Sequence, residues 1–454
     1  MTHPPLFKGQ SEFYKNLLAI SIPIMFQNFL GSLVTMLITI LVGRLGTVEI
    51  AAVGLGNQVF FIYNLTLFGI CSGGAIFTAQ FWGKKDIAGI RKTLGLCMVL
   101  SLGAAILFTL GTSMIPEALI SIYSRDPLVI EAGAVYLRHL SPGFIPFALS
   151  TVFVLTLRSV EKIRLAVTAS VIAISLNATL NIVLIIGVGP FPAMGVRGAA
   201  IGVSSARYIE MLTLILGTYI FRYPPAGKPR ELFAFNSVYV SRYLKIAIPV
   251  MINETLWSLG VTVQNLVFAR SSTEAIAALN ITGSISGLLW VIFIGFGHGV
   301  AILIGKKIGE GNEMEAREYA SRIIRFMPIV AVGAACLLIP LSHIMLQVLN
   351  VEPSVMRTVR LMIIILCFFY PFKAFHISMV IGTCRAGGDT VFCVVYDLAP
   401  MWAIQLPLAI LAGFVFQAPP HIIYLCLMVE DPVKLALGLW RFKTGKWLRN
   451  VVSD

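Results

Sequence analysis

Several ionisable side chains lie inside long apolar segments of this chain, and among them are Glu254, Lys373, His376 and Asp397. Carboxylates in such places bind protons or cations, and a lysine beside them fills the place of a cation. Glu254 stands near the middle of the segment 242–269, where a charge costs at least ~2.5 kcal/mol on membrane-insertion scales. We therefore predict that Glu254, Asp397 and Lys373 form a cation-coupling site, with sodium possible at Glu254. No catalytic residue and no other metal site is predicted.

The composition shows in what surroundings these side chains lie. The chain has 454 residues, of which 57% are hydrophobic and 12% charged, with a mean hydropathy of +0.88. Soluble proteins are about 25% charged. Apolar stretches long enough to cross a hydrocarbon layer of about 30 Å recur along the chain. The twelve predicted spans are 16–41, 51–79, 93–115, 131–157, 164–188, 196–221, 242–269, 275–304, 322–346, 355–383, 390–416 and 419–439. The predicted fold class is an all-α polytopic membrane protein.

The net charge of +13 follows the predicted membrane topology. If both termini are cytoplasmic, 25 of the 34 lysines and arginines lie in cytoplasmic segments and seven in outside loops. This asymmetry is the bias that orients membrane proteins in the plasma (inner) membrane. The basic charge therefore indicates topology, and nucleic acid is not an expected partner.

The chain also repeats itself. One constant shift aligns "AISIPIMFQNFLGSL" from position 19 with "KIAIPVMINETLWSL" from position 245, and a shift longer by one aligns "LRSVEK" with "CRAGGD". The match predicts two homologous six-helix lobes in the same orientation, with a central cleft suited to alternating access. The predicted divisions are an N-terminal lobe, a cytoplasmic linker, a C-terminal lobe and a basic cytoplasmic tail, at 1–220, 221–241, 242–441 and 442–454.

Several motifs together resemble one family. They are "IPIMFQN", "VGRLGTVEIAAVGLGNQ", "TAQFWGKKD", "ARSSTEAIAALN", "RAGGDT" and "YDLAPMWAIQLPLA", in that order along the chain. The sequence is similar to the multidrug and toxic compound extrusion (MATE) family, and to its bacterial members of Firmicutes type. The resemblance implies a V-shaped fold of twelve helices. It also implies export of organic cations and hydrophobic drugs in exchange for H⁺ or Na⁺, without another cofactor and as a monomer.

The N-terminal half departs from the family pattern. Members often carry acids in the first and fifth spans, where this chain has Ile38 and Ile185. Coupling through an acid of the N-terminal half is therefore not expected, and the acids of the C-terminal half remain.

Polar side chains that share a helix face with these acids are candidates for a substrate cavity. Residues three, four, seven and eleven positions apart lie on one face of a helix. By this spacing Glu254 shares a face with Trp257 and Asn265, and its repeat counterpart is Asn28. The predicted cavity residues are Asn28, Trp257, Asn265, Asn177, Asn181 and His376.

Charged partners are predicted for the remaining intramembrane groups. Lys373 could pair with Asp397 or with Glu254, as a structural clamp or within a proton-coupling network. Arg207 and Glu210, three residues apart, are expected to pair with each other. Two further interpretations concern the cytoplasmic side: Arg158, Arg385 and Asp389 form a gate or turn lock, and Glu430 and Asp431 face loops.

Two other functions fit the sequence less well. A flippase for lipid-linked precursors would need several cavity arginines or lysines to bind a pyrophosphate, and only Lys373 and Arg207 are candidates. An enzyme is not expected, because the sequence contains no HExxH, GxSxG or P-loop motif.

Overall fold

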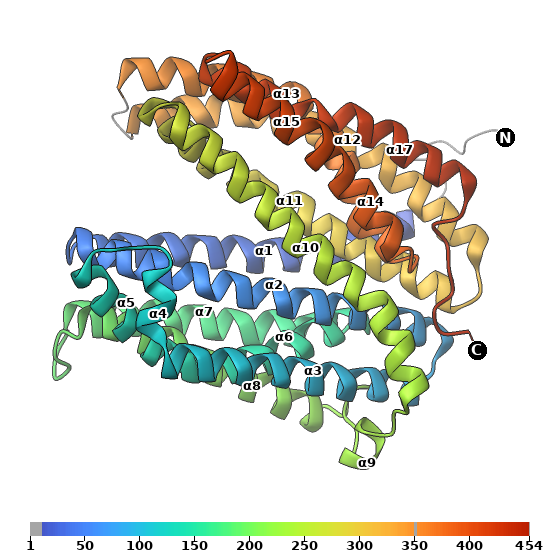
Figure 1. Cartoon of the computed structure of the whole chain (residues 1–454). Coiled ribbons are helices and arrows are strands. Elements are labelled where there is room, and N and C mark those ends of the chain that lie inside the picture. The colour runs from blue at the N-terminus through green and yellow to red at the C-terminus, as the bar shows by residue number, and fades with distance from the viewer. Residues whose placement is uncertain (1–10, 349–351, 454) are drawn as a thin grey trace. The chain divides into compact units, whose positions relative to one another are not determined.

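The computed structural model describes residues 11–348 and 352–453, and within them the chain is helical and has no β-strand (Figure 1). Eleven helical segments of this part are long and apolar enough to cross a membrane. The twelfth predicted span, 419–439, is divided between two shorter helices that meet at Val429. The all-α membrane fold predicted from the sequence is confirmed.

The described residues of the first half form nine α-helices and one short 3₁₀ turn, η1 (Ser141–Gly143), between α5 and α6. The α-helices are α1 (Ser11–Gly43), α2 (Thr47–Lys84), α3 (Ile87–Met114), α4 (Pro116–Ser121), α5 (Pro127–Leu140), α6 (Phe144–Ser159), α7 (Ile163–Ile186), α8 (Gly195–Ile220) and α9 (Pro229–Leu232).

The second half adds three π-helical segments, η2, η3 and η4, among its described residues. Its elements are α10 (Ser237–Ser271), α11 (Thr273–Gly309), α12 (Glu313–Val348), α13 (Pro353–Ile377), η2 (Ser378–Arg385), α14 (Thr390–Pro400), η3 (Met401–Gln405), α15 (Leu406–Ile410), η4 (Leu411–Val415), α16 (Pro420–Met428) and α17 (Glu430–Thr444).

The packing of the helices divides the chain into two compact units. The first unit comprises Met1–Met25 and Ile252–Asp454, and the second comprises Phe26–Met251. Both α1 and α10 therefore contribute to both units. The division falls shortly after Pro23 and Pro249, each of which removes one backbone hydrogen bond inside its helix. The lobe boundaries predicted from the repeat stay a prediction, because they follow sequence similarity rather than packing.

Glycines allow the exchanged helix segments to pack closely. In the second unit a Cβ on Gly69 or Gly73 of α2 would collide with Met251 or Ala247 of α10. In the first unit a Cβ on Gly295 of α11 would collide with Met25 of α1. Small residues at such crossings let helix backbones approach each other within a membrane. The shift that pairs positions 19 and 245 also pairs Gly69 with Gly295, so the repeated glycines mark the same crossing in each half.

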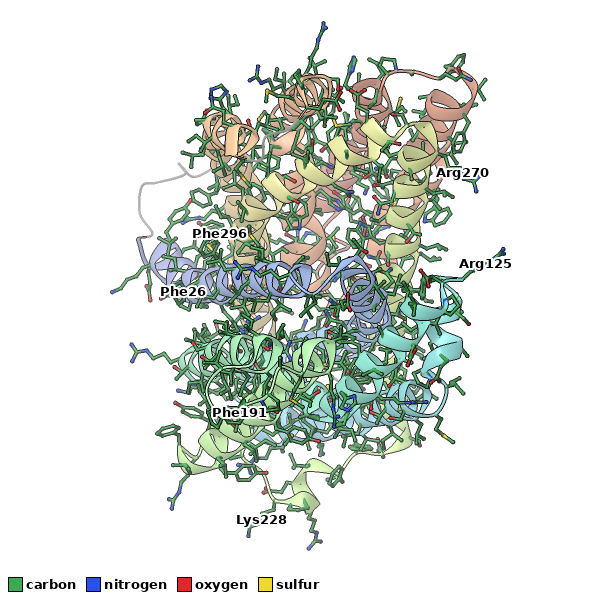
Figure 2. All side chains as sticks on the ribbon, turned by 90° about the vertical axis from the view of Figure 1, so that its left-hand side faces the viewer. Phe26, Arg125, Phe191, Lys228, Arg270 and Phe296 are labelled. Atoms are coloured by element: carbon green, nitrogen blue, oxygen red, sulfur yellow. The ribbon has the colours of Figure 1, made fainter. Side chains whose placement is uncertain are left out.

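The outer surface of the helices is apolar, and charges gather near the helix ends. On α3, Leu107 is 68% exposed and Leu110 is 53% exposed. Lys228, before α9, and Arg125, between α4 and α5, extend away from the helices (Figure 2). This distribution is the one that a lipid-facing surface between two aqueous phases requires.

The turn between η2 and α14 is held by the end of the chain. Gly388 has a φ of +75°, and the Arg449 amide donates to the Gly387 carbonyl at 2.8 Å. Trp447 is fully buried beneath this turn. The segment predicted as a cytoplasmic tail therefore begins with the last residues of α17. After α17 it packs against the turn between η2 and α14.

We predict that Gly388→Ala lowers the unfolding temperature of the purified protein. An L-residue in this left-handed conformation costs roughly 1–2 kcal/mol, and the new Cβ would lie 2.5 Å from Val451 Cγ1. Gly333→Ala is the control, because a Cβ there has nothing within 4 Å in α12. Thermal unfolding in detergent measures both variants. Equal unfolding temperatures would show that the tail does not constrain this turn.

Candidate functional site

Glu254 is paired with an arginine from the distal end of η2. The Arg385 Nη2 lies 2.5 Å from Glu254 Oε1, and the two side chains are 6% and 14% exposed. The prediction that Lys373 pairs with Glu254 is therefore wrong. A guanidinium satisfies a carboxylate in an apolar interior through a charge-assisted hydrogen bond.

The local backbone places Arg385 at this point. The segment η2 is wound as a π-helix, with i→i+5 hydrogen bonds in place of the α-helical pattern. It packs on α11, where Gly297 lies against Ile377 and Ile381. The extra width of a π-turn changes the direction of the side chains that follow it. Arg385 is the last residue of this segment, and its side chain points to α10.

Asp397 lies at the centre of a second group of polar contacts. Its Oδ1 is 3.1 Å from Lys434 Nζ and 3.3 Å from His376 Nε2, and its Oδ2 accepts a 2.9 Å hydrogen bond from Asn253 Nδ2. The predicted pair of Lys373 with Asp397 is wrong, because Lys373 Nζ lies 3.3 Å from Asp431 Oδ2. The residue of α13 that faces Asp397 is His376 and not Lys373. The lysine beside Asp397 is Lys434, which comes from α17.

Three charged residues of α17 were not recognised from the sequence. Glu430 and Asp431, expected to face loops, are 6% and 2% exposed. Lys434, for which no role was predicted, is 2% exposed, and its Nζ lies 3.0 Å from Glu430 Oε2. The available signal was the spacing of Glu430 and Lys434, four residues apart within the predicted span 419–439. That spacing places an acid and a base on one helix face.

The second unit contains a polar core of the same plan. Gln27 Nε2 donates to Ser170 at 2.6 Å, and Gln27 Oε1 accepts from Arg158 Nη2 at 2.6 Å. Ser170 donates to Glu210 at 2.7 Å, and Arg207 binds Glu210 at 2.9 Å. The predicted pairing of Arg207 with Glu210 is confirmed.

The two cores correspond position by position. The shift that pairs positions 19 and 245 also pairs Gln27 with Asn253. The shift longer by one, which aligns "LRSVEK" with "CRAGGD", pairs Ser170 with Asp397, Arg158 with Arg385, and Arg207 with Lys434. In each unit an amide of the repeat's first helix donates to the side chain at the Ser170 or Asp397 position. The duplication therefore preserved the contact but gave a serine to one copy and a carboxylate to the other.

The predicted gate residues are separated by the structure. Asp389 is fully buried and binds Arg441 at 2.6 Å and Arg449 at 2.9 Å, whereas Arg385 binds Glu254. Arg158 binds Gln27. Asp389 thus connects α17 and the segment after it to the turn between η2 and α14. Arg385 and Asp389 do not pair, because the turn at Gly387 and Gly388 lies between them and they are not on one helix.

The predicted cavity residues lie in different surroundings. Asn181 is fully enclosed, bonded to Asn177 on its own helix and pressed against Gly202 of α8, so it serves helix packing. Trp257 is 38% exposed, Asn265 is exposed and Asn28 is half-buried. A cavity role for Asn28, Trp257, Asn265 and Asn177 stays a prediction. Among the described residues no group of three or more His, Cys, Asp or Glu side chains could hold a metal ion.

Comparison with known proteins gives a consistent result. The family model described as MatE matches this chain twice, at residues 23–183 and 249–411. The probable multidrug resistance protein NorM of Thermotoga maritima is 25% identical over 448 residues, covering 97% of this chain and 94% of that protein. Multidrug resistance protein PmpM of Pseudomonas aeruginosa is 23% identical, covering 89% and 85%.

Solved structures show the same fold. The crystal structure of MATE in complex with MaL6 superposes with a TM-score of 0.87 at 18% identity, covering 97% of this chain and 98% of that one. A transporter of the MOP superfamily from Pyrococcus furiosus, described as having a binding pocket of reverse polarity, gives a TM-score of 0.83 at 18% identity, with 97% and 98% covered. The two matches of the family model start at Pro23 and Pro249, which the internal repeat also pairs.

We predict that Lys434→Met destabilises the protein by about 3–5 kcal/mol, because it leaves Asp397 and Glu430 buried without their ammonium partner. Lys443→Met removes an exposed lysine of the same helix and should be nearly neutral. Adding Asp397→Asn to Lys434→Met should recover part of the loss. Thermal unfolding of these proteins and of Asp397→Asn alone measures the coupling. Additive effects would contradict a shared ion pair.

Proposed function

This chain belongs to the MatE family, and we propose that it is a secondary active efflux antiporter that exports organic cations and hydrophobic drugs in exchange for protons. The names of several relatives, which include the words multidrug resistance, support export of drugs. The long apolar helices and the duplicated six-helix plan support alternating access across a membrane. The sequence has no P-loop, so a gradient rather than bound ATP is the expected source of energy.

The pairing of Glu254 with Arg385 is the observation that favours protons over sodium. A sodium ion would have to displace the guanidinium from Glu254 and would leave Arg385 as an uncompensated interior charge. A proton neutralises the carboxylate itself, in a state where Arg385 has moved to another partner. The pair therefore acts as a two-position element that proton binding opens. Each charge moved through 100 mV supplies ~2.3 kcal/mol for this exchange.

The orientation and surroundings of the transporter belong to the same proposal. The excess of lysine and arginine on one side favours cytoplasmic N- and C-termini in the plasma membrane. The partners are then the lipid bilayer and small-molecule substrates, without nucleic acid, and the working form is a monomer.

The flippase alternative receives less support from the interior arginines and lysines. Arg158, Arg207, Arg385, Lys373 and Lys434 are each bonded to an amide or carboxylate of their own unit. A pyrophosphate would have to compete with these partners for each positive charge, so an anionic lipid headgroup fits this chain less well than a cation.

We predict that Glu254→Gln abolishes gradient-driven ethidium transport in proteoliposomes, because the amide takes up no proton and does not compensate Arg385. Glu117→Gln is the matched control: Glu117 also binds an arginine, Arg138 at 2.7 Å, but both side chains are about half exposed. Imposed H⁺ and Na⁺ gradients are applied separately to each protein. Normal transport by Glu254→Gln, or wild-type transport driven by sodium alone, would contradict the proposed coupling.

A further inference from the structure

Two buried acids of the first unit, Asp397 and Glu430, share one permanently charged base, Lys434. We define the inner cluster as the residues that make these two contacts and the neighbouring ion pairs of Glu254 with Arg385 and of Lys373 with Asp431, together with His376. The ion pairs of Asp389 with Arg441 and Arg449 form a separate group. The members are Glu254, Lys373, His376, Arg385, Asp397, Glu430, Asp431 and Lys434. Four are carboxylates and three are lysine or arginine. With a neutral His376, the cluster carries one uncompensated negative charge.

A single negative charge in this interior is expensive. An ion moved from water into an apolar protein interior costs several kcal/mol even after relaxation, unless a counter-charge accompanies it. Bound sodium would be one counter-charge, but the described parts of the chain contain no group of three or more His, Cys, Asp or Glu side chains that could hold a metal ion. Ammonium groups already occupy the places beside Asp397 and Asp431. A proton is therefore the fitting compensation.

The contacts indicate which group takes this proton. Asp397 accepts from Asn253 and lies beside both Lys434 and His376, so an ionised carboxylate fits its surroundings. Lys434 is shared, because its Nζ also lies 3.0 Å from Glu430 Oε2. If His376 is protonated, Asp397 has its own cation and Lys434 is left to Glu430. Every carboxylate then has one partner: Glu254 with Arg385, Asp397 with His376, Glu430 with Lys434 and Asp431 with Lys373.

The surroundings of His376 agree with this role. Its Nε2 faces Asp397, its ring stacks on the buried Tyr396 of α14 at 5.4 Å, and its Nδ1 makes no hydrogen bond to any described residue. Histidine is the side chain whose charge changes between about pH 5 and 8 without special tuning. One nitrogen thus meets the acid, while the other is not committed to a partner.

Other titratable and charged groups on the elements packed against α13 are accounted for as follows. On η2 they are Cys384 and Arg385, on α16 His421, Tyr424 and Cys426, and on α17 Glu430, Asp431, Lys434, Arg441 and Lys443. The helix α11 carries Glu274, His298, Lys306 and Lys307. On α12, Arg322 binds Glu318 and Arg325 binds Ser321, both on their own helix.

The corresponding core of the second unit provides an internal contrast. There Ser170 stands at the position of Asp397, and Glu210 is the only carboxylate among the described contacts, beside Arg207 and near Arg158 through Gln27. Within these contacts that core has two arginines and one carboxylate, so it has no surplus negative charge and no histidine. The surplus arose only in the copy that also contains His376.

We propose that His376 holds one exchangeable proton beside Asp397 while Glu254 is paired with Arg385. As a part of transport this inference rests on the proposed antiport, because the stored proton would belong to the ion that is exchanged. In this step a hydronium ion of the aqueous phase gives a proton to the imidazole, which leaves water and an imidazolium. In the reverse step the imidazolium returns the proton to water. No other bond forms or breaks.

Infrared difference spectra of the reconstituted protein between about pH 5.5 and 8 test the inference without requiring transport. Histidine labelled with ¹³C identifies imidazole bands. We expect an imidazole signal in the wild type that His376→Gln removes. His139→Gln is the control, because His139 lies on α5 and bonds to the Val135 carbonyl of its own helix. An imidazole spectrum that His376→Gln leaves unchanged would overturn the proposal, as would a protonated carboxyl band that only Glu430→Gln removes.

A second variant decides the matter if His376→Gln does not fold. Asp397→Asn removes the counter-charge that faces His376 Nε2, so the imidazolium bands assigned to His376 should be lost. Imidazolium bands equal to those of the wild type would contradict the proposal. Transport is then measured at several pH values: one proton changes the wild-type rate by up to about tenfold per pH unit, and His376→Gln should flatten this to less than about twofold.

The two proposals fail in different ways. If no gradient drives wild-type transport while the imidazole signal behaves as described, the antiport proposal is wrong and the protonation site stands. If transport is driven by protons but the His376→Gln spectrum equals that of the wild type, the antiport stands and the protonation site is wrong. Addition of sodium at constant pH completes the test, since loss of the imidazole signal would show that a cation replaces the proton.

Discussion

A charge inside an apolar interior needs an opposite charge or a polar hydrogen-bond partner, and this constraint explains much of the arrangement of the first unit. Arg385 meets Glu254, Lys434 meets Asp397 and Glu430, and Lys373 meets Asp431. These pairs join α10, α13, η2, α14 and α17 into one connected interior. The helices are not held by apolar packing alone, because lipid is as apolar as the side chains that face it. Ion pairs and close glycine crossings supply specificity that the hydrophobic effect cannot supply in a membrane.

Comparison of the duplicated halves shows that the backbone of the turns is the same in both halves, whereas the side chains of the polar cores differ. Lys85 and Gly311, which the repeat pairs, both have a left-handed backbone, with φ of 60° and 76°. Glu161 and Gly388, also paired by the repeat, have φ of 60° and 75°. Turn geometry is therefore kept even where the side chain is not glycine. The polar cores, in contrast, exchanged Ser170 for Asp397 and Arg207 for Lys434, so chemical differences between the halves lie in side chains on a common backbone.

The membrane spans and the internal repeat could be predicted from the sequence, because each is encoded by a pattern within one segment or by the similarity of the two halves. Apolar length located the spans, self-similarity located the repeat, and a three-residue spacing located the pair of Arg207 with Glu210. Partners between different helices were missed. Arg385 meets Glu254 because a π-helical segment turns it toward α10, and Lys434 meets Asp397 because α17 begins with charges that remain inside. The rotation of a helix and the depth at which it starts depend on tertiary packing, which periodicity alone does not contain.

The exchange of helix segments between the two units has a consequence for the synthesis of the chain. Residues of α1 before Phe26 belong with Ile252–Asp454, and Gly295 and Gly299 of α11 form the surface on which Met25 and Ser21 rest. A ribosome makes α1 first, so these residues wait through the whole first repeat before their packing partner exists. The first unit is closed only later still, when Trp447 reaches the Gly387–Gly388 turn. The packing of that unit is consequently complete only after the residues around Trp447 have been made.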